Sequence, residues 1–146
     1  MKRTLLLLLL ALVGITACAE TATIGLLTLE IPDDFKTEIR CGKDSLGDQE
    51  INRWRAEDGR YIELLYFASG PEQVRDPQPM IVAEKEEIEV AGQKTALIKT
   101  EVFFGVDQKV LVVHLQFGDS IYIIYSERIS KEEFKLWLTT HVILRP

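Results

Sequence analysis

The sequence contains few of the residues that build metal and redox sites. Only two of its 146 residues are cysteine and only two are histidine. The spacings typical of a structural zinc site, a zinc-protease helix and an EF-hand calcium loop are all absent. We therefore expect neither a metal nor another cofactor. A chain of this length can bury enough apolar surface to fold without one.

The motifs of hydrolases are also missing. No serine lies in a G-x-S-x-G or S-x-x-K motif. Cys41 stands between Arg40 and Lys43, and neighbouring cations favour the reactive thiolate. A thiol enzyme would also need His114 or His141 beside Cys41. A single cysteine without a family signature is little evidence for catalysis, so we expect no enzyme and keep the thiol enzyme as an alternative.

The chain has fewer basic than acidic residues. The chain has 17 basic and 23 acidic residues, which gives a net charge of −6. Affinity for nucleic acid comes mainly from neutralising phosphates, so an acidic chain is a poor partner for it. The same charge opposes electrostatic docking on anionic lipid. We expect no nucleic-acid partner.

Long hydrophobic runs are absent except at the start of the chain. Lys2 and Arg3 precede an apolar run from Thr4 to Gly14, which is shorter than the ~20 residues that span a bilayer. A charged start, an apolar run and small residues are typical of a signal peptide, here residues 1–17. A retained transmembrane anchor is the alternative. The rest of the chain is then exported.

The end of the signal peptide, Ile15–Cys18, resembles the lipobox of bacterial lipoprotein precursors. The resemblance implies cleavage before Cys18 after its thiol has been diacylated. Two acyl chains anchor a protein stably, whereas one binds marginally. The residue after the cysteine is Ala19 and not an aspartate. By the sorting rule of that family, this implies transport to the outer membrane, with the domain facing the periplasm. The alternative is an A-x-A site at Ala17–Ala19, whose cleavage would leave a soluble periplasmic module that binds a small ligand.

Lipidation of Cys18 has further consequences. It leaves Cys41 as the only thiol and therefore excludes a Cys18–Cys41 disulfide. Cleavage after Ala19 would exclude this disulfide too, because it removes Cys18. Loss of Lys2 and Arg3 lowers the net charge from −6 to −8. Residues 18–23 are then a lipidated N-terminus with a short tether that reaches roughly 20 Å. Residues 24–146 are expected to form one domain.

Most of that domain has the pattern of β-strands. Thr23–Ile31 predicts one strand. Asp58–Gly59 predicts a hairpin with a two-residue type I′ turn, in which Glu57 faces Arg60. A second hairpin turns at Gly118–Asp119. Its strands are apolar on both faces, which predicts a central position covered on both sides.

The last segment, Ser130–Leu144, predicts a helix. Ser130 is expected as its N-cap, with Glu133 completing a capping box. The spacing of Phe134, Trp137, Leu138 and His141 creates one apolar face.

Four stretches together resemble the PsbP-like superfamily, which includes bacterial periplasmic proteins of the DcrB type. These stretches are "LEIPDDF", "IEVAGQKTALIKTEVFF", "SIYIIYSE" and "SKEEFKLWLTTHVIL". The resemblance implies an α+β fold: one domain with a central twisted antiparallel sheet and helix cover on both sides, including the C-terminal helix. It also implies a non-catalytic, protein-binding role. The chain departs from the pattern at Ser69–Met80, a proline-rich loop where relatives often have a helix.

Two segments provide a candidate binding surface for a protein partner. Arginine and aromatic residues are enriched at interface hot spots. The candidates are Arg53, Trp54, Arg55, Arg60 and Tyr61 around the first hairpin, and Pro71, Arg75 and Pro77 in the loop. Strand alternation places Trp54 opposite its two arginine neighbours. The alternative is therefore that Trp54 lies in the core and the arginines are solvated.

Overall fold

The computed structural model describes residues 18–41, 49–68 and 80–145, which form eleven strands and one helix. The first five strands are β1 (Cys18–Ile24), β2 (Leu27–Pro32), β3 (Phe35–Cys41), β4 (Gln49–Ala56) and β5 (Tyr61–Phe67). The next five are β6 (Ile81–Val90), β7 (Gln93–Phe103), β8 (Val106–Asp107), β9 (Leu111–Phe117) and β10 (Ser120–Glu127). Helix α2 (Lys131–His141) and strand β11 (Val142–Leu144) complete the chain.

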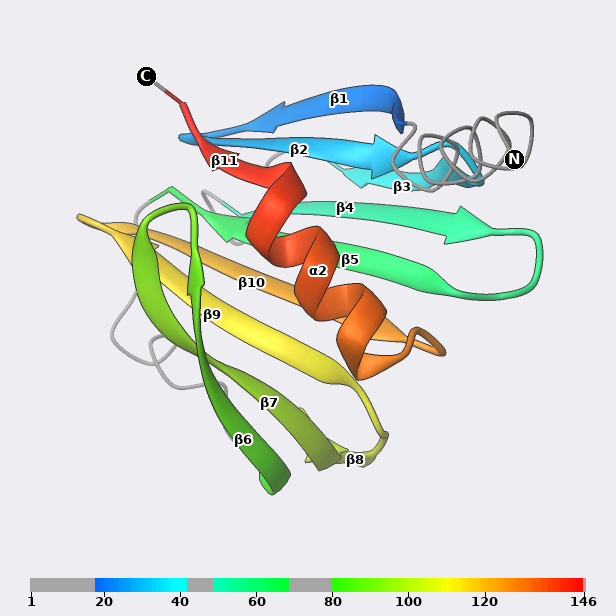
Figure 1. Ribbon diagram of the computed structural model, residues 1–146, viewed down its shortest axis with the longest axis vertical. Coiled ribbons are helices and arrows are strands. Elements are labelled where there is room, and N and C mark those ends of the chain that lie inside the picture. Colours follow the sequence, from blue (N-terminus) through cyan, green and yellow to red (C-terminus); the bar gives the residue numbers. More distant parts are fainter. Residues whose placement is uncertain (1–17, 42–48, 69–79, 146) are drawn as a thin grey trace, which may run out of the picture.

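The strands form two antiparallel sheets (Figure 1). The large sheet has the order β3-β4-β5-β10-β9-β7-β6, with the short β8 paired to β7. The small sheet has the order β1-β2-β11. Sequential neighbours pair through short turns in most cases, which keeps the connections local. Strands β5 and β9 flank β10 at the centre of the large sheet.

One face of the large sheet is covered by the small sheet and α2 together. Leu27, Leu29 and Ile31 of β2 are fully buried against it. Phe134 and Leu138 of α2 are fully buried in the same core. Figure 1 shows the helix crossing the central strands, with the small sheet at one end of the molecule. This layer encloses the larger of two hydrophobic clusters.

The other face of the large sheet holds the second hydrophobic cluster. Ile121, Ile123 and Tyr125 of β10 point into it, whereas Tyr122 and Ile124 point into the first. The prediction that the Gly118–Asp119 hairpin is central and buried on both faces is confirmed. Its register is also as predicted, since Ser120 pairs with Phe117.

The expected helix-covered α+β fold is wrong. The protein is mostly β, and α2, with 11 residues, is the one helix in the described residues. The cover that the apolar hairpin requires comes partly from a second sheet. A stretch of β-branched and aliphatic residues can supply an apolar face in an extended conformation as well as in a helix, so the pattern alone could not distinguish the two.

The expected single strand at Thr23–Ile31 is also wrong, because the segment is a hairpin. Gly25 and Leu26 form a two-residue turn between β1 and β2, with Gly25 at φ +56°. A positive φ at the first turn position is the type II′ geometry, which favours glycine there. Strand β1 begins at Cys18. The residues expected as a tether, 18–23, therefore belong to the small sheet.

The hairpin predicted at Asp58–Gly59 is present, but its turn has a different length and type from those expected. Ala56 pairs with Arg60, and the backbone N–H of Gly59 donates to the carbonyl of Ala56 at 3.1 Å. Only Gly59 in this turn has a positive φ, +90°. This is a three-residue loop with a glycine bulge, not a type I′ turn. Glu57 consequently does not face Arg60.

The C-terminal helix is shorter than predicted. The Ser130 hydroxyl accepts from the Glu133 N–H at 3.2 Å, so the predicted N-cap is confirmed. The helix ends at His141, and Val142–Leu144 continues as β11 beside β2. Consecutive branched residues favour a strand there. No helix among the described residues is long and apolar enough to cross a membrane.

Candidate functional site

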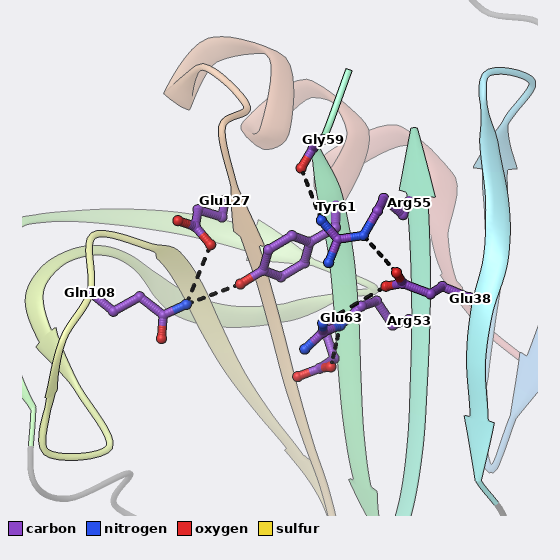
Figure 2. Close-up of polar contacts among 8 residues, drawn as sticks. All are labelled: Glu38, Arg53, Arg55, Gly59, Tyr61, Glu63, Gln108 and Glu127. Carbon is purple, nitrogen blue, oxygen red and sulfur yellow. Dashed lines mark hydrogen bonds and ion pairs between the residues drawn. The ribbon is translucent and has the colours of Figure 1, made fainter. Parts of the chain in front are cut away.

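Paired polar side chains surround Tyr61, the first residue of β5. This group includes three of the predicted binding residues, Arg53, Arg55 and Tyr61. We define the Tyr61 cluster as Glu38, Arg53, Arg55, Tyr61 and Glu63 (Figure 2). These residues come from the neighbouring strands β3, β4 and β5. Because alternate residues of a strand share one face, Arg53 and Arg55 lie side by side there, as do Tyr61 and Glu63.

Both arginines lie against the ring of Tyr61. The guanidinium carbon of Arg53 is 4.7 Å from the ring centroid, and that of Arg55 is 5.0 Å away. Such cation–π contacts hold a guanidinium in a defined orientation. The arginines also shield the ring, so that Tyr61 is only 6% exposed.

Two glutamates pair with the arginines. Glu63, itself buried, accepts from Arg53 Nε at 2.7 Å, directly across the β4–β5 ladder. Glu38 accepts from Arg55 Nε at 2.9 Å and lies 3.8 Å from Arg53 Nη1. Burial opposes the charge of Arg53, but the hydrogen bond and charge of Glu63 outweigh it, so the pKa of Arg53 is raised. The cluster is therefore charge-paired.

The hydroxyl of Tyr61 faces Gln108, the residue after β8, and Glu127 of β10. It accepts from Gln108 Nε2 at 3.0 Å, and the same amide nitrogen lies 3.4 Å from Glu127 Oε2. Burial, followed by the nearby Glu127 carboxylate, raises the pKa of Tyr61 to about 12. The hydroxyl therefore keeps its proton at neutral pH. In that state it can donate or accept a hydrogen bond, but it cannot act as a general base.

The outer side chains of the Tyr61 cluster are partly exposed to solvent. The side chains of Arg55 and Glu38 are 36% and 39% exposed, so each retains hydrogen-bonding groups toward solvent. Beneath them lie the buried side chains of Tyr61 and Glu63. These buried groups fix the positions of the exposed side chains. Among the described residues, no group of three or more histidine, cysteine or acidic side chains could hold a metal ion.

The structure does not bring all the predicted surface residues together. Arg53, Arg55 and Tyr61 form one cluster, whereas Trp54 is 2% exposed in the core of the opposite face. The indole has no access to a partner. The alternative that strand alternation favoured is thus confirmed for Trp54, while the two arginines are ion-paired and partly exposed.

Arg60 belongs to a separate cluster on the α2 side of the sheet. Its guanidinium carbon lies 5.2 Å from the Phe35 ring centroid. It pairs with Asp34, with Asp58 at 2.7 Å and with Glu133 of α2 at 3.2 Å. Hydrogen bonds from Arg60, first from its backbone N–H, lower the pKa of Asp58. Arg60 thus ties the hairpin to the start of the helix.

Several predicted residues lie outside the described residues. These are Pro71, Arg75 and Pro77 of the loop. Cys18 and Cys41 are the first residue of β1 and the last residue of β3, but their side chains are not described. His141 Nδ1 lies 2.8 Å from Glu30 Oε2. The thiol-enzyme alternative and the acylation of Cys18 are left untested by this geometry.

Sequence analysis missed the acidic half of the Tyr61 cluster. Glu63 was detectable, because it directly faces Arg53 once the hairpin loop is given three residues instead of two. Glu38 had no comparable signal, since β3 reaches it through a bulge between Thr37 and Ile39. Gln108 and Glu127 are also distant in the sequence from Tyr61.

The chain was compared with known protein families and with curated proteins. It matches no protein family, and no curated protein matches it. The resemblance to the PsbP-like superfamily stays a prediction, and the helix cover that it implied is wrong.

Proposed function

We propose that the protein is a lipoprotein of the bacterial cell envelope, anchored through acylated Cys18 and facing the periplasm. The observation that carries this proposal is the lipobox Ile15–Cys18 directly after the apolar run Thr4–Gly14. Two acyl chains on one residue are sufficient for a stable anchor. Because Ala19, and not an aspartate, follows Cys18, the lipoprotein would be sorted to the outer membrane.

The position of Cys18 in the fold adds a structural consequence. Cys18 pairs with Pro32 at the end of the small sheet, so the lipid would be attached directly to a strand. Asp33 and Asp34 follow Pro32 and are exposed. Acidic groups gain nothing from an anionic bilayer surface, so the acyl chains would supply the attachment by themselves.

Replacing Cys18 tests the anchor. In Cys18→Ala cells, we expect cleavage at the A-x-A site Ala17–Ala19 instead, so that the exported domain leaves the membrane fraction and appears in the soluble fraction. Cys41→Ser is the matched control and should fractionate as wild type. A Cys18→Ala chain that has lost residues 1–17 and still stays with the membrane as wild type does would contradict the proposal.

We further propose that the anchored domain is a non-catalytic protein-interaction module and that the Tyr61 cluster is its contact surface. The exposed edge of Arg55 offers N–H groups to carboxylate or carbonyl oxygens of a partner. The stacked and paired arginines are already ordered, which lowers the entropic cost of binding.

Crosslinking in whole cells tests this role. Arg55→Ala should reduce capture of the partner, because it removes exposed donors without entering the core. Lys85→Ala is the control, since Lys85 is exposed on β6, at the opposite edge of the large sheet from β3. Equal loss in both variants, or in neither, would contradict the assignment of this surface.

Cleavage after Ala19 is the competing proposal, favoured by the A-x-A pattern of Ala17–Ala19. It yields a soluble periplasmic module beginning at Glu20 of β1, a residue that still pairs with Ile31 of β2. That module would hold a small ligand. The mass of the mature N-terminus distinguishes the two proposals.

A further inference from the structure

The free edges of the two sheets are protected to very different degrees. An exposed edge strand offers unpaired backbone groups to another chain, and proteins block it with charges, bulges or short strands. Edge strand β6 has five charged residues among ten, and edge strand β3 has three among seven and a central bulge. At the other end of the small sheet, β11 has only three residues.

Strand β1 has little of this protection. It is seven residues long, contains no proline, and has Glu20 as its only charged residue. Its one bulge lies at the Cys18 end, which leaves Glu20–Ile24 regular. Among the described strands it pairs with β2 alone, and Figure 1 shows it at the outer border of the molecule. Thr21, Thr23 and Ile24 of this strand favour an extended conformation.

The turn after β1 determines which backbone groups face outward. In a two-residue hairpin, the closing pair, here Ile24 and Leu27, is hydrogen-bonded, and bonded pairs then alternate along the ladder. Ala22 therefore bonds to Leu29. The N–H and C=O groups of Thr21 and Thr23 point to the free side, where a further strand could bond to them.

We propose that β1 pairs with β1 of a second copy of this chain, antiparallel about a two-fold axis at Ala22. In this register Thr21 faces Thr23 of the partner subunit, and the outward backbone groups of both form four hydrogen bonds. Cross-strand threonine pairs are favourable. Glu20 faces Ile24 of the partner subunit, so the two carboxylates do not oppose each other.

The local sequence favours a second copy over a foreign strand. Glu20-Thr21-Ala22-Thr23-Ile24 places a threonine on each side of a central alanine, so the edge is complementary to itself. A two-fold pair also closes, because each copy uses its single β1 edge in the contact. One strand edge buries less than the ~1,000 Å² of a stable interface, so the pair would be weak in dilute solution. If the proposed anchor holds, confinement to a membrane raises the local concentration.

Register-specific disulfide formation tests this pairing. In the full chain with Cys41→Ser, Ala22→Cys is compared with Thr21→Cys and Thr23→Cys after mild oxidation of cells. Residues that face each other in a non-bonded antiparallel pair have Cα atoms about 4.5 Å apart, which suits a disulfide. We expect Ala22→Cys to yield at least about fivefold more covalent dimer than either neighbour, because only position 22 faces itself.

A second variant guards against effects on folding. Adding Thr23→Lys to Ala22→Cys should reduce the dimer, because lysines on the edge oppose pairing. Adding Thr140→Lys, at an exposed threonine of α2, should leave it unchanged. Equal yields at positions 21, 22 and 23, a maximum at 21 or 23, or a disulfide to a different protein would overturn the proposal.

The outcome can be separated from that of the anchor. The Cys41→Ser parent retains Cys18, and covalent dimers of this parent would show a free Cys18 thiol and so count against lipidation alone. The oxidation is repeated on concentrated purified exported chain. Register-specific dimers there, with the chain absent from membranes, support the pairing and contradict the anchor. Absence of dimers in both settings overturns the pairing.

Discussion

At the scale of single residues, two buried hydroxyls differ in how they are bonded. Ser126 is 1% exposed, and its Oγ has no hydrogen-bond partner in the described part of the chain. Thr100 is fully buried, but its Oγ1 accepts from the Val110 N–H at 3.1 Å and donates to the Gln108 carbonyl at 2.9 Å. An unpaired buried polar group is costly, whereas a paired one is nearly neutral or favourable.

Removing these hydroxyls should therefore have opposite effects. Ser126→Ala is expected to raise the free energy of unfolding by about 1 kcal/mol, because it removes an unsatisfied group. Thr100→Val should lower it by about 1–3 kcal/mol, since it leaves the Val110 N–H unpaired. Urea unfolding of both variants measures the difference. A loss of stability in Ser126→Ala as large as that in Thr100→Val would contradict this account.

Tyr61 makes the protein sensitive to high pH. Its pKa is raised from 10.0 to about 12, mainly by burial, so the folded state holds this proton more tightly than the unfolded state. The resulting stabilisation is complete below pH 10 and disappears as the pH rises from 10 to 12. Absorbance titration of the tyrosines should show a late-ionising group that Tyr61→Phe removes. A wild-type titration without that late group would contradict the assignment.

At the scale of elements, the β1–β2 turn depends on Gly25. A Cβ at this position would lie 2.3 Å from the Tyr122 hydroxyl oxygen and 2.7 Å from Tyr66 Cζ. The turn is also bonded to that hydroxyl, because the Leu26 N–H donates to it at 2.7 Å. Gly92, in the β6–β7 turn, also has a positive φ, but nothing lies within 4 Å of its Cβ position.

These two glycines give a matched pair of substitutions. Gly92→Ala should cost about 1 kcal/mol, from backbone strain alone. Gly25→Ala should cost about 2–4 kcal/mol, because the small sheet must move away from the tyrosines as well. Thermal unfolding of both variants measures the costs. Equal costs would show that the contact with Tyr66 and Tyr122 is not a constraint.

Turn length decided how much of the site could be predicted. The Gly118–Asp119 turn has two residues as expected, so the register and both faces of that hairpin were correct. The turn near Gly59 has three, so pairing from a two-residue turn shifts the register by one. A shift of one residue changes every cross-strand partner. It placed Glu57 opposite Arg60 and concealed the Arg53–Glu63 pair.

At the scale of the whole molecule, the sequence predicted a doubly covered central hairpin but not its cover. The apolar character of both faces of β9 and β10 is a local property, and it was sufficient to predict their position. The identity of the covering layer depends on contacts between distant segments, such as Leu29 of β2 with Val142 of β11. Branched residues near the two ends of the chain pair in one small sheet. The residue pattern at either end alone does not reveal this pairing.

We propose that the small sheet begins at a lipid-modified residue, Cys18. Mass spectrometry of the mature N-terminus, isolated from membranes of cells that express the full chain, tests it most directly. We predict an N-terminal Cys18 bearing a diacylglyceryl group, and no peptide from residues 1–17. A mature chain that begins with an unmodified Glu20, or one that retains residues 1–17, would contradict the account.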